Sequence, residues 1–315
     1  MRQWLQLIKE DTPGTTPTAD ADNSIWIDLE ENDPAINLVP VMYKIRSAMP
    51  KRGMVDRLSG SAQDGISGSI PTALYHEQAD FWKATVFEPT YGVSAPHPPT
   101  GLPTVTINRG WLDDSGTARY ERYKRCMLTG YTISGSSEGT AAPIRLSVNV
   151  IGGEYDGEAT ITPPACTAFP TELYLWTMCD FELNNVSIKS YVSSLSLSVN
   201  HMITPRQHMN RYPDSYHYAG WEKSFSVGMD MFSHAYRTKF LDIRTAFSSA
   251  IYATNNSFVM TYAADKKVTF DFFNAMFSAL DPQRPPGAPH TQNATIVPYY
   301  DCTNLDLTCT ITNPA

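Results

Sequence analysis

The stretch SLSLSVNHMITPRQHMNRYPDSYHYAGWEKSFSVGMDM, residues 194–231, alternates apolar and polar residues at both of its ends. The alternating apolar residues are Leu195, Leu197 and Val199 near the start and Phe225, Val227 and Met229 near the end. Such alternation is typical of strands with one apolar and one wet face. A long polar and aromatic segment with two arginines separates the two runs, although two residues suffice to close a hairpin. We therefore predict a long hairpin with an unusually large tip.

The composition is that of a globular protein with a core, since 42% of the 315 residues are hydrophobic and 18% are charged. A net charge of −8 argues against a protein that grips nucleic-acid phosphates. The sequence has no apolar run long enough to span a membrane, and the N-terminal apolar stretch is too short for a signal peptide. We expect neither a membrane segment nor a cofactor.

Five cysteines are spread along the chain without a CxxC pair, which disfavours both a zinc site and a disulfide framework. They are Cys126, Cys166, Cys179, Cys302 and Cys309. We expect buried free thiols in a protein made in a reducing cytoplasm.

Strand patterns dominate the rest of the chain, between Gly, Pro, Asn and Ser punctuation. Two segments instead show apolar residues at helical spacing, residues 73–89 and 232–253, and we expect helices packed on a sheet there. Residues 1–37 are rich in Thr, Pro and acids, so we predict an extended acidic N-terminal arm.

A weak internal repeat relates the two halves of the chain. Gly60 and Gly68 lie 160 residues before Gly220 and Gly228, and each pair frames a strand that leads into a predicted helix. This spacing predicts a first module at residues 38–185 and a second at 186–315. Identity between the halves is low, so chance similarity is the alternative to a duplication.

The segments VSSLSLSVNHMITPR and AGWEKSFSVGMDMFSHAYRTKF resemble the major tail tube proteins of long-tailed, siphophage-like bacteriophages. RLSGSAQDGISGSIPTALYHEQADFWKATVF resembles the same motif in the first half, and YKRCMLTGYTISGSSEGTAAPIRLSVNVIGGEYDG resembles the family's central strand pair. The resemblance covers most of residues 38–280. It departs from the family pattern in the aromatic second tip and in the acidic arm.

The resemblance implies a mainly β fold with two buttressing helices, arranged as two tandem tail-tube-type β-sandwich or barrel modules with long inter-ring hairpins. It further implies rings, stacked into a tube, whose lumen conducts DNA. Two modules per chain would close a ring with three copies, and one module with six. The implied partners are the chain itself, the tail tape measure, and the terminator and baseplate or tip proteins. DNA would pass transiently, in a virion tail assembled in the bacterial cytoplasm.

Two groups of residues are the predicted contact sites. The candidate inter-ring residues of the hairpin tips are Lys51, Arg52, Arg57, Arg206, Arg211, Tyr212 and Tyr216. The candidate lumen-facing residues are Ser67, Ser69, Ser194, Ser196, Ser198, Ser224, Ser226 and Asp230. A polar, weakly acidic wall suits DNA passage because a basic wall would hold phosphates.

Other functions leave weaker signals. The sequence lacks G-x-S-x-G, P-loop and H-E-x-x-H motifs, and its histidines are not at metal-ligand spacing, so we predict no enzyme and no metal site. One alternative is another β-rich virion protein, from the neck, terminator or capsid surface. A second is a carbohydrate-binding β-sandwich that uses the tyrosines near residue 216.

Overall fold

The computed structural model describes most of the chain, in ranges separated by gaps. The described residues are 3–15, 19, 23–27, 37–38, 41–49, 53–63, 66–87, 102–112, 115, 117–137, 142–156, 170–206, 215–229, 256–272, 274–283, 291–299 and 307–314. The second predicted helix, residues 232–253, lies outside these ranges.

The fold is mainly β, which confirms the predicted class. The first-half strands are β1 (Gln3–Lys9), β2 (Ser24–Ile27), β3 (Asn37–Leu38), β4 (Val41–Met49), β5 (Gly53–Gln63), β6 (Ile66–Ala73), β7 (Val105–Leu112), β8 (Ala118–Ser136) and β9 (Arg145–Tyr155). The second-half strands are β10 (Cys179–Leu183), β11 (Val186–Ser187), β12 (Val192–Arg206), β13 (Ser215–Met229), β14 (Asn256–Ala263), β15 (Lys266–Phe272), β16 (Asn274–Gln283), β17 (Thr291–Tyr299) and β18 (Thr308–Thr312). The helical turns are η1 (His76–Gln78), α1 (Ala79–Trp82), η2 (Lys83–Phe87) and η4 (Trp176–Met178).

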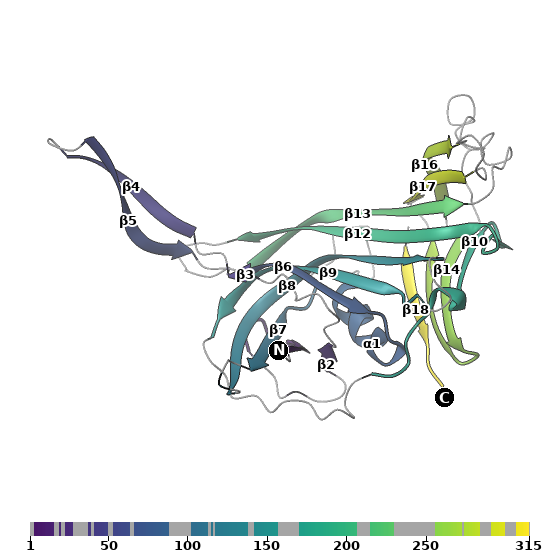
Figure 1. Ribbon diagram of the computed structural model, residues 1–315, viewed down its shortest axis with the longest axis horizontal. Helices are drawn as coiled ribbons and strands as arrows, with labels where there is room; N and C mark the ends of the chain where they lie inside the picture. The colour runs from purple at the N-terminus through teal and green to yellow at the C-terminus, as the bar shows by residue number, and fades with distance from the viewer. Residues whose placement is uncertain are drawn as a thin grey trace.

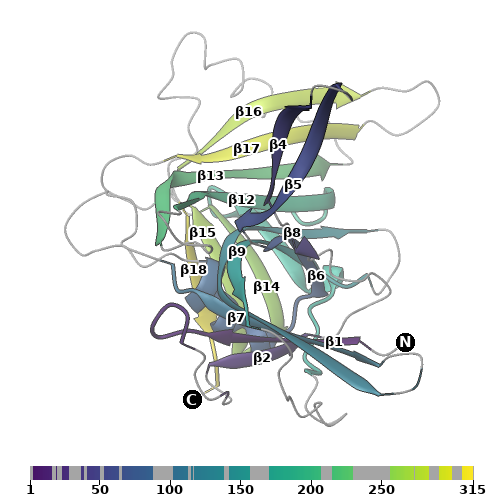
Figure 2. The same cartoon turned by 90° about the vertical axis from the view of Figure 1, so that its left-hand side faces the viewer.

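Eight strands form one continuous antiparallel layer, which we call the inner sheet. Its order is β3-β6-β9-β8-β12-β13-β17-β16, so that β8 and β12 join the strands of the first half to those of the second. Figure 2 shows the second-half strands of this layer, with β16, β17, β13 and β12 following one another.

A second layer, which we call the outer layer, lies on one side of the inner sheet. In the first half it consists of β2, β1, β7 and the beginning of β8, and in the second half of the five-stranded sheet β11-β10-β14-β15-β18. Together with α1, strands β10, β14 and β18 lie on the same side of the long strands β12 and β13 (Figure 1).

The strands β8 and β9 belong to both layers. Residues 118–126 of β8 pair with β7, whereas residues 130–136 pair with β12. β9 follows this path, and its last residues pair with the outer half of β8. In the second half, separate strands follow the same path. β15 of the outer layer is followed along the chain by β16 of the inner sheet, and β17 of the inner sheet is followed by β18 of the outer layer.

The pairing scheme of the first half recurs in the second. The β1·β2, β1·β7 and β7·β8 pairs of the outer layer correspond to β10·β11, β10·β14 and β14·β15. In the inner sheet, β3·β6, β6·β9 and β8·β9 correspond to β12·β13, β13·β17 and β16·β17. On this scheme β1 and β2 group with the first half, and β10 and β11 with the second.

The predicted match of Gly60 and Gly68 with Gly220 and Gly228 does not agree with this scheme. Gly68 pairs with the buried Val150, so it lies on the covered face of the inner sheet. Gly228 pairs with the exposed Asn293 and lies on the opposite face. Side chains alternate between the two faces along a strand, so residues related by an even shift such as 160 should lie on the same face of equivalent strands. Gly68 and Gly228 lie on opposite faces and are therefore not equivalent positions.

The segment predicted to be an extended arm contains two strands of the outer layer. β1 pairs with β7 along its whole length and with β2 on its other edge. Its side chains Leu5, Leu7 and Ile8 are buried, as is Ile27 of β2. Burial of apolar side chains on both faces of β1 holds this segment in the core, although the polar residues around it resemble a linker.

A helical segment, residues 76–87, is present where the first helix was predicted. It passes from a 3₁₀ turn through one α turn into a π turn, and the Thr85 hydroxyl donates to the Phe81 carbonyl at 2.7 Å. Its last residue, Phe87, packs against Tyr131 of β8 and Phe270 of β15 at ring-centre distances of 4.9 and 5.3 Å. The segment thus joins the two layers and the two halves of the chain.

The core between the layers is rich in aromatic contacts. Phe225 of β13 lies 4.6 Å from Phe272 of β15 and 5.6 Å from Phe181 of β10, measured between ring centres. All three side chains are buried. Burial of each such ring typically contributes about 1.5–3 kcal/mol, so this cluster is a main attachment of the outer layer to the inner sheet.

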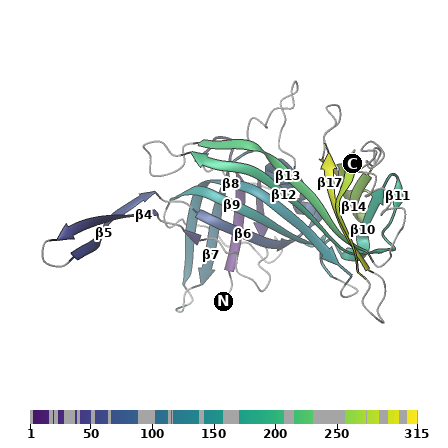
Figure 3. The same ribbon diagram turned by 90° about the horizontal axis from the view of Figure 1, so that it is seen from above.

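The β4–β5 hairpin extends away from both layers (Figures 1 and 3). Its strands pair from Val41 with Gln63 to Met49 with Gly53, at the end far from the body. The hairpin is the first-half counterpart of the distal part of β12–β13, since both continue an inner-sheet strand pair.

Candidate assembly and channel surfaces

The face of the inner sheet opposite the outer layer carries small polar side chains in rows across the strands. One row joins Ser136, Ser194, Gly228 and Asn293 of four neighbouring strands. The next rows are Arg145, Ser134, Ser196, Ser226 and Thr295, followed by Ser147, Thr132, Ser198 and Ser224. We call this surface the polar face; its members are exposed or half-buried.

The predicted alternation of apolar and polar residues in 194–200 and 224–229 is present in the structure. Leu195, Leu197 and Val199 are buried on β12, and the serines between them are on the polar face. β13 shows the same pattern, with its apolar residues buried. All the predicted lumen-facing serines of these two strands therefore share one face. Asp230 lies outside the described residues.

The first half contributes to the same face. Ser67 is exposed, and Ser69 is half-buried and pairs with the exposed Asn149. The polar face has few charges among the described side chains; Arg145 and Glu222 are its exposed charged members. A hollow of about 170 Å³ beside Arg145 is lined by Thr132, Ser134 and Ser147, together with Pro71, Thr72 and Leu146. The wall is polar and nearly neutral.

Three of the predicted inter-ring residues, Arg57, Arg206 and Tyr216, lie within the described ranges. Lys51, Arg52, Arg211 and Tyr212 lie outside the described residues. Arg57 stands opposite Ile45 in the β4–β5 hairpin. Arg206 is exposed at the far end of β12, opposite Ser215.

Tyr216 makes its contacts inside the chain rather than at a free tip. Its hydroxyl donates to the Arg125 carbonyl at 2.5 Å and accepts from the Gly153 amide at 3.3 Å. Burial is the main cause that raises the pKa of Tyr216, so the phenol stays protonated and keeps its donor.

Arg125 is fixed from its other side by a buried carboxylate. Its amide donates to Glu10 at 3.0 Å, and the same carboxylate accepts from the Thr104 and Thr106 hydroxyls at 2.6 and 2.7 Å. The Gly14 amide supplies a fourth donor at 2.8 Å. This set satisfies the acceptor capacity that a buried carboxylate requires. Three of these partners, Thr104, Thr106 and Arg125, are about a hundred residues from Glu10 along the chain, so the site could not be predicted from sequence spacing.

A buried cluster around His201 also escaped the sequence analysis. His201 is 1% exposed, and its Nε2 lies 2.8 Å from the Val86 carbonyl, at the end of the helical segment. Its ring stacks on Trp221 with centres 5.9 Å apart. Burial is the main cause that lowers the pKa of His201 to about 4, so the ring is neutral near pH 7 and Nε2 is the donor to Val86.

Lys223 lies beside this cluster on the covered face of β13, where alternation predicts an apolar residue. Its Nζ is 3.5 Å from the centre of the Trp221 ring, a geometry that favours an ammonium. Burial nevertheless lowers the pKa of Lys223 to about 6.

The ends of the inner sheet are β3 and β16. β16 pairs with β17 along one edge, and within the described ranges no strand pairs with its other edge. Among the described residues, β3 pairs with Ile66 and Ser67 of β6, at the opposite end of the sheet. Edges of this kind are templates for pairing with another chain.

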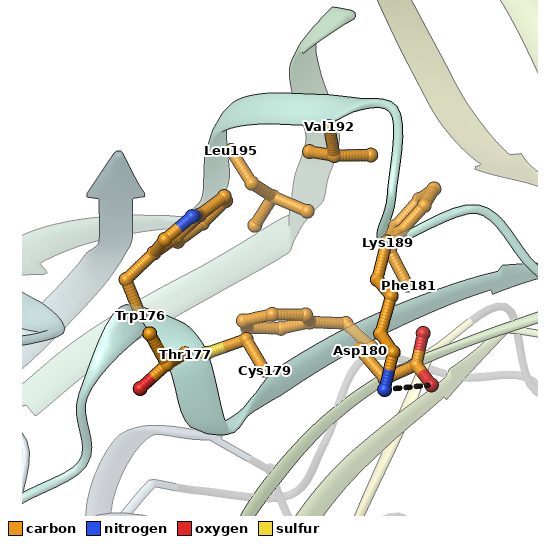
Figure 4. A pocket seen from close by; sticks show the side chains of 9 residues that line it. Trp176, Thr177, Cys179, Asp180, Phe181, Lys189, Val192 and Leu195 are labelled. Atoms are coloured by element: carbon orange, nitrogen blue, oxygen red, sulfur yellow. Dashed lines mark ion pairs between the residues drawn. The ribbon is translucent and has the colours of Figure 1, made fainter. Parts of the chain in front are cut away.

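A pocket of about 210 Å³ lies between the two layers at the start of β12 (Figure 4). Trp176, Phe181, Val192 and Leu195 line it, together with Phe258. The rim carries an ion pair between Lys189 and Asp180 at 4.0 Å. Its walls are mostly apolar and carry no converging catalytic groups.

The described residues give no sign of a metal centre or a membrane helix. Within the described ranges, no group of three or more His, Cys, Asp or Glu side chains is placed to hold a metal ion. In the same residues, no helix is long and apolar enough to cross a bilayer. Cys126, Cys179 and Cys309 form no disulfide, and burial raises the pKa of the Cys126 thiol.

A mainly β chain with a polar sheet face, open sheet ends and a projecting hairpin has the features of a structural assembly subunit. A family model described as phage tail tube protein matches residues 2–309, nearly the whole chain. The chain therefore belongs to the phage tail tube protein family, as the resemblance predicted. Members of this family are structural proteins that assemble into the tube of the phage tail. No curated protein matches the chain.

Burial of Lys223 predicts a pH-dependent stability. Because its pKa falls from 10.5 in the unfolded chain to about 6 in the folded chain, the folded state binds fewer protons between these values. Stability should then rise with pH across this window. Replacement by methionine, Lys223→Met, removes the penalty, so its gain in melting temperature should be largest near pH 6 and shrink as the pH approaches 10.

Thermal melts of the wild type and Lys223→Met at several pH values measure this directly. The exposed Lys189→Met is the matched control and should show no such trend. A pH-independent difference for Lys223→Met would show that Lys223 is not a desolvated amine.

Proposed function

We propose that this chain forms rings that stack into the tail tube, and that the polar faces of the rings line a lumen that conducts DNA. The observation that carries the proposal is the inner sheet, which repeats one strand order twice and has one polar face along both repeats. With two modules in each chain, three copies would close a ring.

Ring closure follows from the way in which the two halves of the chain join. β8, the last inner strand of the first half, pairs with β12, the first inner strand of the second. In the repeated scheme β16 takes the place of β8, and β3 takes the place of β12. Pairing of β16 from one copy with β3 of the next would extend the same sheet across the subunit boundary. Three such steps would leave no open edge.

The expected size fits the passage of a DNA duplex. Three copies of the eight-stranded sheet give about 24 strands, which at roughly 4.8 Å spacing make a circumference of about 115 Å and a backbone diameter of about 37 Å. Strand tilt widens the barrel, and side chains narrow its opening. A duplex of about 20 Å can still pass.

The chemistry of the polar face supports conduction without binding. Ser, Thr and Asn side chains keep the wall hydrated, and a wall with little positive charge offers few sites where phosphates would displace their counterions. The acidic net charge of −8 has the same effect over a longer range.

Assembly defines the other proposed partners. The tape measure would occupy the lumen before DNA, and terminator and baseplate or tip proteins would end the tube. The charged residues of the hairpin tips, including Arg206, would meet acidic surfaces of the adjacent ring and fix its orientation. We place assembly in the bacterial cytoplasm and favour a siphophage-like tail.

Negative-stain electron microscopy of the purified chain over a range of concentrations tests the proposal. We expect hollow filaments or stacked rings whose end views average with three-fold symmetry. Isolated rings that never stack would favour a neck or terminator protein. A monomer at every concentration, even with purified tail-tip complexes as initiators, would contradict a tube subunit.

The polar face can be tested by placing positive charge on it. The double variant Ser196→Arg and Ser226→Arg adds two arginines to one row of the wall. We expect tails of normal length whose phages eject DNA at least several-fold more slowly, because phosphates pair with the added charges. The matched control is Ser196→Asn with Ser226→Asn, which keeps the wall neutral. Equal ejection rates in both variants would show that this face does not meet DNA.

A further inference from the structure

We infer that the β4–β5 hairpin packs sideways on the neighbouring copy of its own ring, across the place where that copy's β15 passes into β16 and its β17 passes towards β18. The inference rests on the proposed ring and names a contact within it. The partner is a second copy of this chain, the same copy whose β16 would pair with β3.

The β12–β13 hairpin provides the precedent within one chain. Its pairing with β8 ends at Asn200 opposite Gly130, yet the hairpin continues to Arg206 opposite Ser215. Beyond Gly130, β8 turns away into the outer layer to pair with β7. The distal part of this hairpin therefore lies against the turning point of the first half rather than beside a strand.

Tyr216 attaches the hairpin to this turning point. Its hydroxyl bridges the Arg125 carbonyl and the Gly153 amide, one from each of the two strands that change layers. Arg125 has a φ of 55°, and Gly152 and Gly153 have φ values of 79° and 92°. A Cβ on Gly152 would stand 2.1 Å from the Tyr216 hydroxyl, so the backbone here is shaped to receive that side chain.

His201 makes a second attachment closer to the sheet. Its Nε2 reaches the Val86 carbonyl at the end of the helical segment, and its ring lies against Tyr131 and Trp221. Together with Tyr216, it holds the second-half hairpin against the first half over a length of several residues. This is a contact between laterally adjacent modules.

The β4–β5 hairpin is in the equivalent position but extends away from its own chain (Figure 3). In the repeated scheme, β3 of one copy lies beside β16 of the preceding copy in the ring, just as β12 lies beside β8 within one chain. The turning point that corresponds to Arg125 and Gly153 is then formed by the ends of β15 and β17 on that copy. Only the tip of the hairpin is left to reach the next ring.

The test is removal of the hairpin in the full chain. Lys44 pairs with Leu58, so replacing residues 45–57 with an Asn-Gly turn closes β4 on β5 without changing their register. The monomer should keep its circular dichroism spectrum and melting temperature, because the hairpin lies outside both layers. We expect at least a tenfold loss of closed rings by electron microscopy and sedimentation.

The matched control shortens only the tip, with residues 50–52 replaced by the same turn. This variant should still close rings, whether or not they stack. If the variant without residues 45–57 forms closed rings that fail to stack, or normal tubes, the lateral contact is wrong and the hairpin acts only between rings. Failure of the unmodified chain to form rings would instead count against the proposed function.

A photo-crosslinker at position 57 gives an independent readout. In assembled tubes of Arg57→p-benzoylphenylalanine, we expect crosslinks between copies at residues near the β15–β16 junction or the end of β17, mapped by mass spectrometry. Crosslinks found exclusively elsewhere would overturn the inference.

Discussion

Backbone hydrogen bonding at the ends of the inner sheet is the constraint on which this structure depends. Among the described residues, the eight-stranded inner sheet ends at β16 on one side and at the two-residue strand β3 on the other, and the outer edge of β16 carries a row of amide and carbonyl groups. Proteins that remain monomeric usually shorten, bulge or charge such edges. Here β16 has a register shift between Phe277 and Ala279, but it is ten residues long and continues the order of the sheet, which suits an edge that is completed by another copy.

The two layers are joined by strands that change sheet rather than by loops. β8 and β9 pass from the inner sheet to the outer layer in the first half, and the left-handed backbone at Arg125, Gly152 and Gly153 makes this turn. The second half makes the same passage with four shorter strands. Tyr216 and Glu10 hold the first turn from both sides, so the angle between the layers and the direction of the second hairpin are set at one place.

Sequence reasoning predicted the parts of the fold that depend on local alternation. Leu195 to Val199 and Phe225 to Met229 lie on the covered face as expected, because a period of two is a direct consequence of strand geometry. The predicted equivalence of Gly68 and Gly228 is wrong, because the two residues lie on opposite faces of the inner sheet. Glycine has no side chain, so its polarity cannot indicate the face on which it lies. The first strand was missed because its short apolar run is followed by residues with the composition of a linker.

The interior contacts could not be predicted from a single sequence. Glu10 meets Thr104 and Arg125 only after three strands have paired, and Tyr216 looks like a tip residue until the bend in β8 is known. Lys223 breaks the alternation of β13 without a local cause. Each of these residues depends on tertiary packing, which propensity and spacing do not encode.

Hydrogen–deuterium exchange on monomers and assembled tubes would show whether the inner sheet closes edge to edge between copies. With such closure, exchange in tubes slows most strongly in peptides of β16 and of β3 with the start of β6, and changes little in peptides of β14 and β15. Slowing confined to β11 and β18, the edges of the five-stranded sheet, would show instead that copies meet through the outer layer and that the inner sheet does not close the ring.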